Sequence, residues 1–155
     1  MNAIAWQLEH SVETAASASF AWSYLTDVRN WSDPPAEFAL DGPFETGSQG
    51  TTLMPGQGPV RWRITDVQAG QSYTIETELT GATLSFKWCF DALSGQRTRL
   101  TQRIVLTGSN GAAHAQLMET SFGANLQGGM ERIAAAIATA AARATEKRRD
   151  PQRTV

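Results

Sequence analysis

The feature that most constrains the fold is a run of strand-like segments between residues 60 and 106 that follow one another at hairpin spacing. Apolar and polar side chains alternate, with the period of half-buried β-strands, over 60–67, 73–79, 84–90 and 98–106. Glycine-containing turns separate these segments, which leaves no room for crossover helices. Strands joined by hairpins form an antiparallel sheet, and such a sheet can keep one face in water. We therefore expect an antiparallel sheet with one apolar face.

Three more segments bring this sheet to six or seven strands. The alternation recurs over 6–12 and 36–41, and 51–54 is typical of a short strand. In the first of them apolar residues alternate with polar ones in phase with His10, so the imidazole is predicted to point to the apolar side. The arginines of the later strands are out of phase with the apolar residues and belong on the wet face.

A short helix is predicted after the first strand. Ala21, Trp22, Leu25 and Val28 fall on one helical face, and either Ser17 or Ser19 can serve as the N-cap. The pair Pro34 and Pro35 is expected to end this helical region.

A long helix is predicted near the C-terminus. Its apolar residues recur every three or four positions in one continuous stripe, formed by Met118, Phe122, Leu126, Met130, Ile133 and Ile137. This stripe must pack against another apolar surface, and the large one available is the apolar face of the sheet, so the helix should lie across that face. Gly123, Gly128 and Gly129 interrupt good helix formers, and a bend or a close approach is expected there.

This order of elements resembles the START-related SRPBCC superfamily of helix-grip proteins, especially its bacterial polyketide cyclase/dehydrase-like members. The resemblance spans residues 6–146 and rests on Ala21, Trp22, Leu25, Asp27 and Trp31, followed by the turn Gly42, Pro43, Phe44 and Gly47. It implies an α+β helix-grip fold, in which a strongly curved antiparallel sheet wraps around the C-terminal helix. It also implies that Asp27 and Trp31 fix the first helix to the sheet.

Length and charge limit the classes of protein that the chain can belong to. Its 155 residues predict a single domain over 1–155, with a core over 6–146 and a charged tail over 147–155. A net charge of -2 gives no reason to expect nucleic acid. The longest strongly apolar run, 133–142, is too short for stable membrane insertion. The single cysteine and the lack of a signal-like N-terminus favour the cytoplasm. A homodimer is left open.

The inward side chains of the predicted sheet and helix either line a ligand cavity or fill the core. An apolar cleft with a few polar groups is typical of a small-molecule site. The residues predicted to contact a ligand are His10, Trp62, Tyr73, Thr77, Phe86, Trp88, Gln102, Phe122, Leu126 and Met130.

His10 is a weak candidate for catalysis, because histidine commonly acts as a general acid or base near neutral pH. The alternative is a core histidine bonded to a backbone carbonyl, and no acidic residue is placed to orient the ring. Neither a metal site nor a cofactor is predicted: His10, His114 and Cys89 have no metal-site spacing, and a phosphate-binding loop and a nucleophile elbow are missing from the sequence.

Three functions remain open at the level of sequence. The favoured one is binding of a small hydrophobic molecule, such as a lipid, a polyketide-like compound or another aromatic or isoprenoid compound, between the C-terminal helix and the sheet. The second is a polyketide cyclase- or aromatase-like enzyme that promotes cyclisation or dehydration, as the resemblance implies. The third is a regulatory or co-chaperone-like interaction module, which would need an exposed apolar patch.

Overall fold

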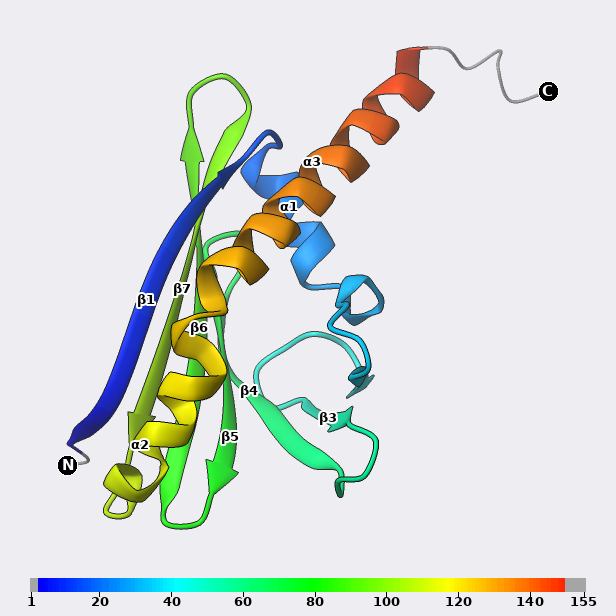
Figure 1. Ribbon diagram of the computed structural model, residues 1–155. Coiled ribbons are helices and arrows are strands. Elements are labelled where there is room, and N and C mark those ends of the chain that lie inside the picture. The colour runs from blue at the N-terminus through cyan, green and yellow to red at the C-terminus, as the bar shows by residue number, and fades with distance from the viewer. Residues whose placement is uncertain (1–2, 150–155) are drawn as a thin grey trace.

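Seven strands form one antiparallel sheet in the computed structural model, which describes residues 3–149 (Figure 1). The strands are β1 (Ile4–Thr14), β2 (Glu37–Asp41), β3 (Gln49–Leu53), β4 (Val60–Gln68), β5 (Ser72–Leu79), β6 (Ala82–Leu93) and β7 (Arg97–Thr107). Their order across the sheet is β1-β7-β6-β5-β4-β3-β2, so the first strand returns to pair with the last. The predicted strands and the antiparallel pairing are confirmed.

The helices all lie on one side of this sheet. They are α1 (Ala18–Leu25), the short 3₁₀ turn η1 (Val28–Asn30), α2 (Gly111–Met118), the π-helical segment η2 (Glu119–Gly123) and α3 (Leu126–Arg149). Figure 1 shows α3 crossing the sheet obliquely, with α2 along the part of the sheet near β1 and β7. A short helix after strand 1 and a long C-terminal helix packed on the sheet confirm the helix-grip fold.

The first helix is shorter than predicted. Ser17, not Ser19, is its N-cap, and the Ser17 hydroxyl accepts a hydrogen bond from the backbone N–H of Phe20. The helix ends at Leu25, well before the two prolines. Two later side chains satisfy its last carbonyl groups: the amide of Asn30 donates to Tyr24, and the indole N–H of Trp31 donates to Leu25. These two bonds end the helix at Leu25 and turn the chain, although the sequence pattern predicts that the helix continues to Val28.

Trp31 also connects this turn to the sheet. Its ring lies 5.4 Å from that of Trp62 on β4 and 5.6 Å from that of Phe38 on β2, measured between centroids. Asp27 caps η1 by accepting a hydrogen bond from the backbone N–H of Arg29, and it forms an ion pair with the guanidinium group of the same residue. Trp31 therefore connects the end of the first helix to the sheet, as the resemblance implies, whereas the side-chain bonds of Asp27 are all to Arg29.

The predicted C-terminal helix is two helices with a break between them. The π-helical segment Glu119–Gly123 follows α2, and α3 begins only at Leu126. The break therefore falls at Gly123, whereas Gly128 and Gly129 lie inside α3 without ending it. Helix α3 continues to Arg149, beyond the predicted end of the core at residue 146. The rest of the predicted tail, 150–155, lies outside the described residues.

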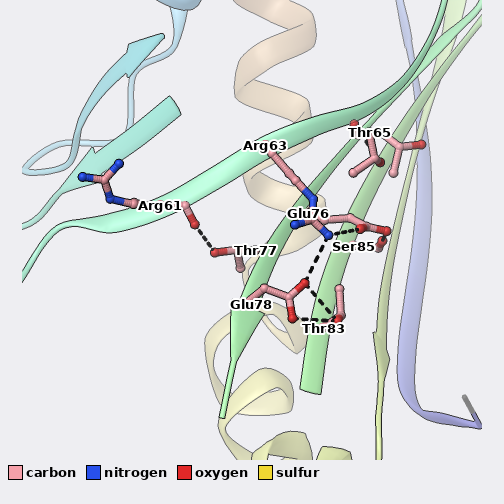
Figure 2. Close-up of polar contacts among 9 residues, drawn as sticks. Arg61, Arg63, Thr65, Glu76, Thr77, Glu78, Thr83 and Ser85 are labelled. Atoms are coloured by element: carbon pink, nitrogen blue, oxygen red, sulfur yellow. Dashed lines mark hydrogen bonds and ion pairs between the residues drawn. The ribbon is translucent and has the colours of Figure 1, made fainter. Parts of the chain in front are cut away.

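The two faces of the sheet differ sharply in polarity. The face under the helices carries the core, which includes Ile64, Leu100, Ile104, Leu106, Met130 and Ile137, all at most 1% exposed. The opposite face is charged: Figure 2 shows Arg63 of β4 beside Glu76 and Glu78 of β5, at 3.5 and 3.4 Å. Glu78 and Glu76 in turn accept hydrogen bonds from Thr83 and Ser85 of β6. The wet face was correctly predicted.

Candidate functional site

Four of the predicted ligand-contacting residues form one row across the inner face, the face of the sheet under the helices. The strand pairing places His10 of β1 opposite Gln102 of β7, Gln102 opposite Trp88 of β6, and Trp88 opposite Tyr73 of β5. Directly opposed residues on one face have Cβ atoms about 4.5–5.5 Å apart. The row therefore sets a polar pair next to an indole ring and a phenol.

The adjacent row is apolar and leads to the π-helical segment. Leu8 lies opposite Ile104, Ile104 opposite Phe86, and Phe86 opposite Ile75. Phe122 covers the Phe86 end: its ring centroid is 5.7 Å from that of Phe86, in an edge-to-face arrangement. It also lies 6.4 Å from the ring of Trp6.

Several side chains between the sheet and the helices keep partial contact with solvent, and six of them lie around the π-helical segment and strands β1, β7 and β6. We call them the inner patch: Trp6, Leu8, His10, Phe86, Gln102 and Phe122, all of intermediate exposure. The other predicted contacts are buried. Trp62, Thr77, Trp88 and Leu126 are 7–9% exposed, and Tyr73 and Met130 are 1% exposed. Four of the ten predicted residues (His10, Phe86, Gln102 and Phe122) thus belong to the inner patch, and the other six are packed.

The threonines of the inner face use their hydroxyl groups within the fold. Thr14 donates to the carbonyl of Ala134 at 2.7 Å, and Thr98 donates to that of Ala16 at 2.8 Å. Thr77 donates to the carbonyl of Arg61, and the indole N–H of Trp62 donates to Thr52 (Figure 2 shows Thr77). The polar atoms of the predicted contacts Thr77 and Trp62 are therefore engaged by the protein itself.

His10, Gln102 and Tyr73 behave differently from the threonines. Within residues 3–149 none of their side chains makes a hydrogen bond to another protein group. Burial raises the pKa of the Tyr73 hydroxyl well above its ordinary range, so the group stays protonated and is available as a donor. Trp22, Phe44 and Phe90 surround the ring of Tyr73, with centroids 4.9–6.0 Å away.

Formal charge is missing from the inner face of the described strands. The inward positions of β1 and β4–β7 carry apolar, aromatic, threonine, histidine and glutamine side chains, and the Asp, Glu, Lys and Arg residues of these strands point outward. A charged ligand group placed there would have no counter-charge from the sheet.

Two recesses stand out on the described surface, and neither lies where the ligand cavity is expected. The larger, about 460 Å³, runs between β1 and α3 and is lined by Val12, Glu13, Thr14, Ala15, Arg97, Glu131, Ala134, Ala135 and Ala138. The smaller, about 270 Å³, lies at the β5–β6 turn beside Gly108. No predicted ligand contact lines either of them. Trp88 on β6 and Met130 on α3, both predicted contacts, are buried in the core.

A comparison with protein-family models matches residues 5–138 to the family described as polyketide cyclase / dehydrase and lipid transport. The chain belongs to this family. The matched span covers all seven strands except the first residue of β1, and about half of α3, so the assignment rests on most of the helix-grip fold and not on one motif. A comparison with curated proteins gives no match.

Solved structures of very different sequence share the fold of this family member. Norcoclaurine synthase from Thalictrum flavum, in complex with dopamine and hydroxybenzaldehyde, has 12% identity and a TM-score of 0.65 over 88% of this chain and 87% of that chain. Ara h 8.0201 has 13% identity and a TM-score of 0.67, over 86% and 98%. The di-domain ARO/CYC StfQ from the steffimycin biosynthetic pathway has 15% identity and 0.66, over 88% of this chain and 51% of that chain.

Other chemistry finds little support in the described part of this family member. No three His, Cys, Asp or Glu side chains of residues 3–149 lie close enough to hold a metal ion. His114 instead contacts the carbonyl of Thr80 at 3.0 Å. Burial raises the pKa of the Cys89 thiol, which disfavours the reactive thiolate form. No helix within this range is long and apolar enough to cross a membrane.

Sequence reasoning missed the contacts that close the inner patch at the π-helical segment. Glu119 accepts a hydrogen bond from the indole N–H of Trp6 at 2.8 Å, across 113 residues of sequence. A methyl group at Gly123 would lie 2.6 Å from the Glu119 carboxylate, so the glycine leaves room for that bond. Gly123 was the available signal, since it interrupts a helical stripe, but its partner depends on tertiary packing.

Proposed function

We propose that this protein binds a small hydrophobic molecule at the inner patch, between the π-helical segment and strands β1, β7 and β6. One observation carries the proposal: aromatic and aliphatic side chains on the concave side of the sheet stay partly exposed although two helices lie over them. Burying exposed apolar area gains about 25 cal/mol per Å². A flat apolar ligand against Phe86 and Phe122 would recover that gain.

Membership of the family supports the proposal. The description of the family includes lipid transport, and one structural neighbour is a complex with two small aromatic compounds. Packing beneath α3 limits where the ligand sits. Trp88 and Met130 are almost fully covered, so the ligand contacts the inner patch directly and reaches deeper only if α2 or α3 shifts outward.

A titration with the uncharged dye Nile red tests the proposal. We expect one saturable site whose fluorescence rises on binding, and we expect Phe122→Ala to weaken binding about tenfold through the loss of an aromatic contact. Leu117→Ala is the matched control, because Leu117 lies on the preceding helix α2 and is 59% exposed. Non-saturable binding, or binding that is sensitive to Leu117→Ala and not to Phe122→Ala, would show that the dye attaches to the outer surface.

A cyclase- or dehydratase-like reaction is the second candidate function, and the pairing of His10 with Gln102 favours it. An imidazole beside an amide can transfer a proton to or from a bound carbonyl compound. His10→Gln keeps a polar group of similar length, so a pure binding protein should lose little affinity. An enzyme should lose turnover by about 10²-fold or more. Native mass spectrometry of the freshly purified protein would identify a co-purified compound on which both effects can be measured.

The interaction-module alternative has weaker support. Among residues 3–149 the large apolar side chains that are clearly exposed are Ile4, Leu53, Val60 and Leu117. They belong to four different elements, β1, β3, β4 and α2. Exposed apolar residues in ones and twos are ordinary on protein surfaces, whereas a docking face needs a large contiguous patch.

A further inference from the structure

We infer that the ligand of the inner patch is an uncharged aromatic compound that carries a hydrogen-bonding oxygen, and that Gln102 recognises this oxygen with His10 beside it. The inference rests on the proposed function and names the ligand class of that site. It follows from which polar groups the fold leaves unused and from the absence of charge on the inner face of the described strands.

Several polar groups of the inner face are already bonded within the protein. The hydroxyl groups of Thr14, Thr77 and Thr98 are bonded to backbone carbonyl groups, so they serve the fold. Among the described inner-face polar side chains this leaves Gln102, His10 and the hydroxyl of Tyr73. Tyr73 is 1% exposed, whereas Gln102 and His10 both belong to the partly exposed inner patch. A ligand at the patch therefore meets Gln102 and His10 first.

Gln102 and His10 together can recognise a ligand oxygen. The glutamine amide offers two donors and one acceptor, so it can bond a carbonyl or a hydroxyl oxygen. The strand pairing sets His10 on one side of Gln102 and Trp88 on the other, with Phe86 one inward position further along β6. A ring that packs on Phe86 and Phe122 therefore has its polar substituent within reach of the amide, which a purely apolar ligand would shield from water without offering a partner.

The inner patch is poorly suited to an anion. A carboxylate or phosphate needs a cation or several donors when water is removed from it. No Lys or Arg occupies an inward position in β1 or β4–β7, and Arg63, Arg99 and Arg103 are all on the outer face. The charged group that the structure places against the inner patch is the carboxylate of Glu119, which is bonded to Trp6 and would repel an anion. The inner patch therefore favours a neutral alcohol, phenol or ketone over the corresponding acid.

Three probes that share one ring system test this ligand class: naphthalene, 2-naphthol and 2-naphthoate, titrated calorimetrically at pH 7. The first lacks an oxygen, the second is an uncharged alcohol and the third is an anion. We expect 2-naphthol to bind about tenfold tighter than naphthalene, because its hydroxyl can form one hydrogen bond that naphthalene cannot form. We expect 2-naphthoate to bind more weakly than both.

The variant Gln102→Leu should keep naphthalene binding and remove the preference for 2-naphthol. Gln7→Leu is the control: Gln7 lies on the outer face of β1, where it accepts a hydrogen bond from Arg103, and its replacement should leave all three affinities unchanged. The wild-type ranking tests the inference even if a variant does not fold.

The outcomes separate the two proposals. Equal binding of naphthalene and 2-naphthol, tighter binding of 2-naphthoate, or a preference that survives in Gln102→Leu would overturn the inference and leave the proposed function standing. If none of the three probes binds to the wild type, the proposed function fails, and the inference fails with it.

Discussion

Replacement of Gly50 by alanine tests how the aromatic cluster at the β3–β4 edge fits together. Gly50 on β3 lies directly opposite Trp62 on β4, and the indole ring lies over it. A methyl group at Gly50 would lie 2.5 Å from Cε2 of Trp62 and closer still to the next two ring atoms, whereas ordinary contacts are 3.4–4 Å. The backbone of Gly50 is not in the left-handed region, so the conflict is one of space alone.

The ring of Trp62 has little freedom to move away. It is 7% exposed, its N–H donates to Thr52 at 3.1 Å, and Trp31 packs against it. Overpacking of this kind costs about 1–3 kcal/mol of unfolding free energy. For a chain of this size each kcal/mol corresponds to about 2–4 °C in the midpoint of thermal unfolding. We therefore expect Gly50→Ala to lower the midpoint clearly.

A double-mutant cycle with Trp62→Phe isolates the cause. Phenylalanine lacks the distal indole atoms that meet the added methyl group, so Gly50→Ala should cost close to nothing in that background. The coupling energy, measured by urea unfolding of the four proteins, should then approach the whole single-mutant cost of about 1–3 kcal/mol. Trp62→Phe alone is destabilising, because it removes a hydrogen bond and leaves a cavity.

Gly58→Ala is the matched control. Gly58 precedes β4 in the same β3–β4 connection and has nothing within 4 Å of an added methyl group, so its substitution should leave the midpoint nearly unchanged. The packing argument is refuted if Gly50→Ala costs as little as Gly58→Ala. It is refuted equally if Gly50→Ala costs the same in the Trp62→Phe background as in the wild type.

Two further predictions concern Tyr73 and the π-helical segment. Burial raises the pKa of Tyr73 above its ordinary value of 10.0, so the contribution of its hydroxyl to folding stability is complete below about pH 10 and is lost above it. Between about pH 9 and 11 the thermal midpoint should therefore fall less in Tyr73→Phe than in the wild type. Equal slopes of midpoint against pH would contradict this. Gly123→Ala should displace the Glu119 carboxylate from Trp6 and cost about 1 kcal/mol in urea unfolding, an effect that should disappear in a Glu119→Ala background.

The strands could be predicted because apolar and polar residues alternate along each of them, and this alternation shows which side chains are buried. Along β6, for example, Leu84, Trp88 and Phe90 are buried while Lys87 between them is exposed. The end of α1 could not be predicted in the same way, since Asn30 and Trp31 bind its carbonyl groups from outside the helical window. The same holds for the break before α3, where a carboxylate bonded to the distant β1 helps to set the geometry.

The sequence predicts which residues face the helices, but not how they are arranged or which of them stay partly exposed. Alternation alone places His10, Gln102 and Trp88 on the inner face, and the structure confirms that face for each. That the three share one row depends on the registers of β1 with β7 and of β7 with β6, which join residues 92 and 14 positions apart and are set by pairing across the sheet. The division between packed and partly exposed residues depends further on where α2 and α3 lie.

Gln102 is the residue at which stability and the inferred function make opposite demands. Its side chain is partly buried between Leu100 and Ile104 on β7, and its amide reaches solvent without a bonding partner among the described residues, so folding gains little from it. Leucine at this position would extend the apolar strip and should raise the unfolding free energy by about 1 kcal/mol, or about 2–4 °C in the thermal midpoint. A lower midpoint for Gln102→Leu would mean that the amide is bonded inside the folded protein, and Gln102 would then be a structural residue and not the group that recognises the ligand.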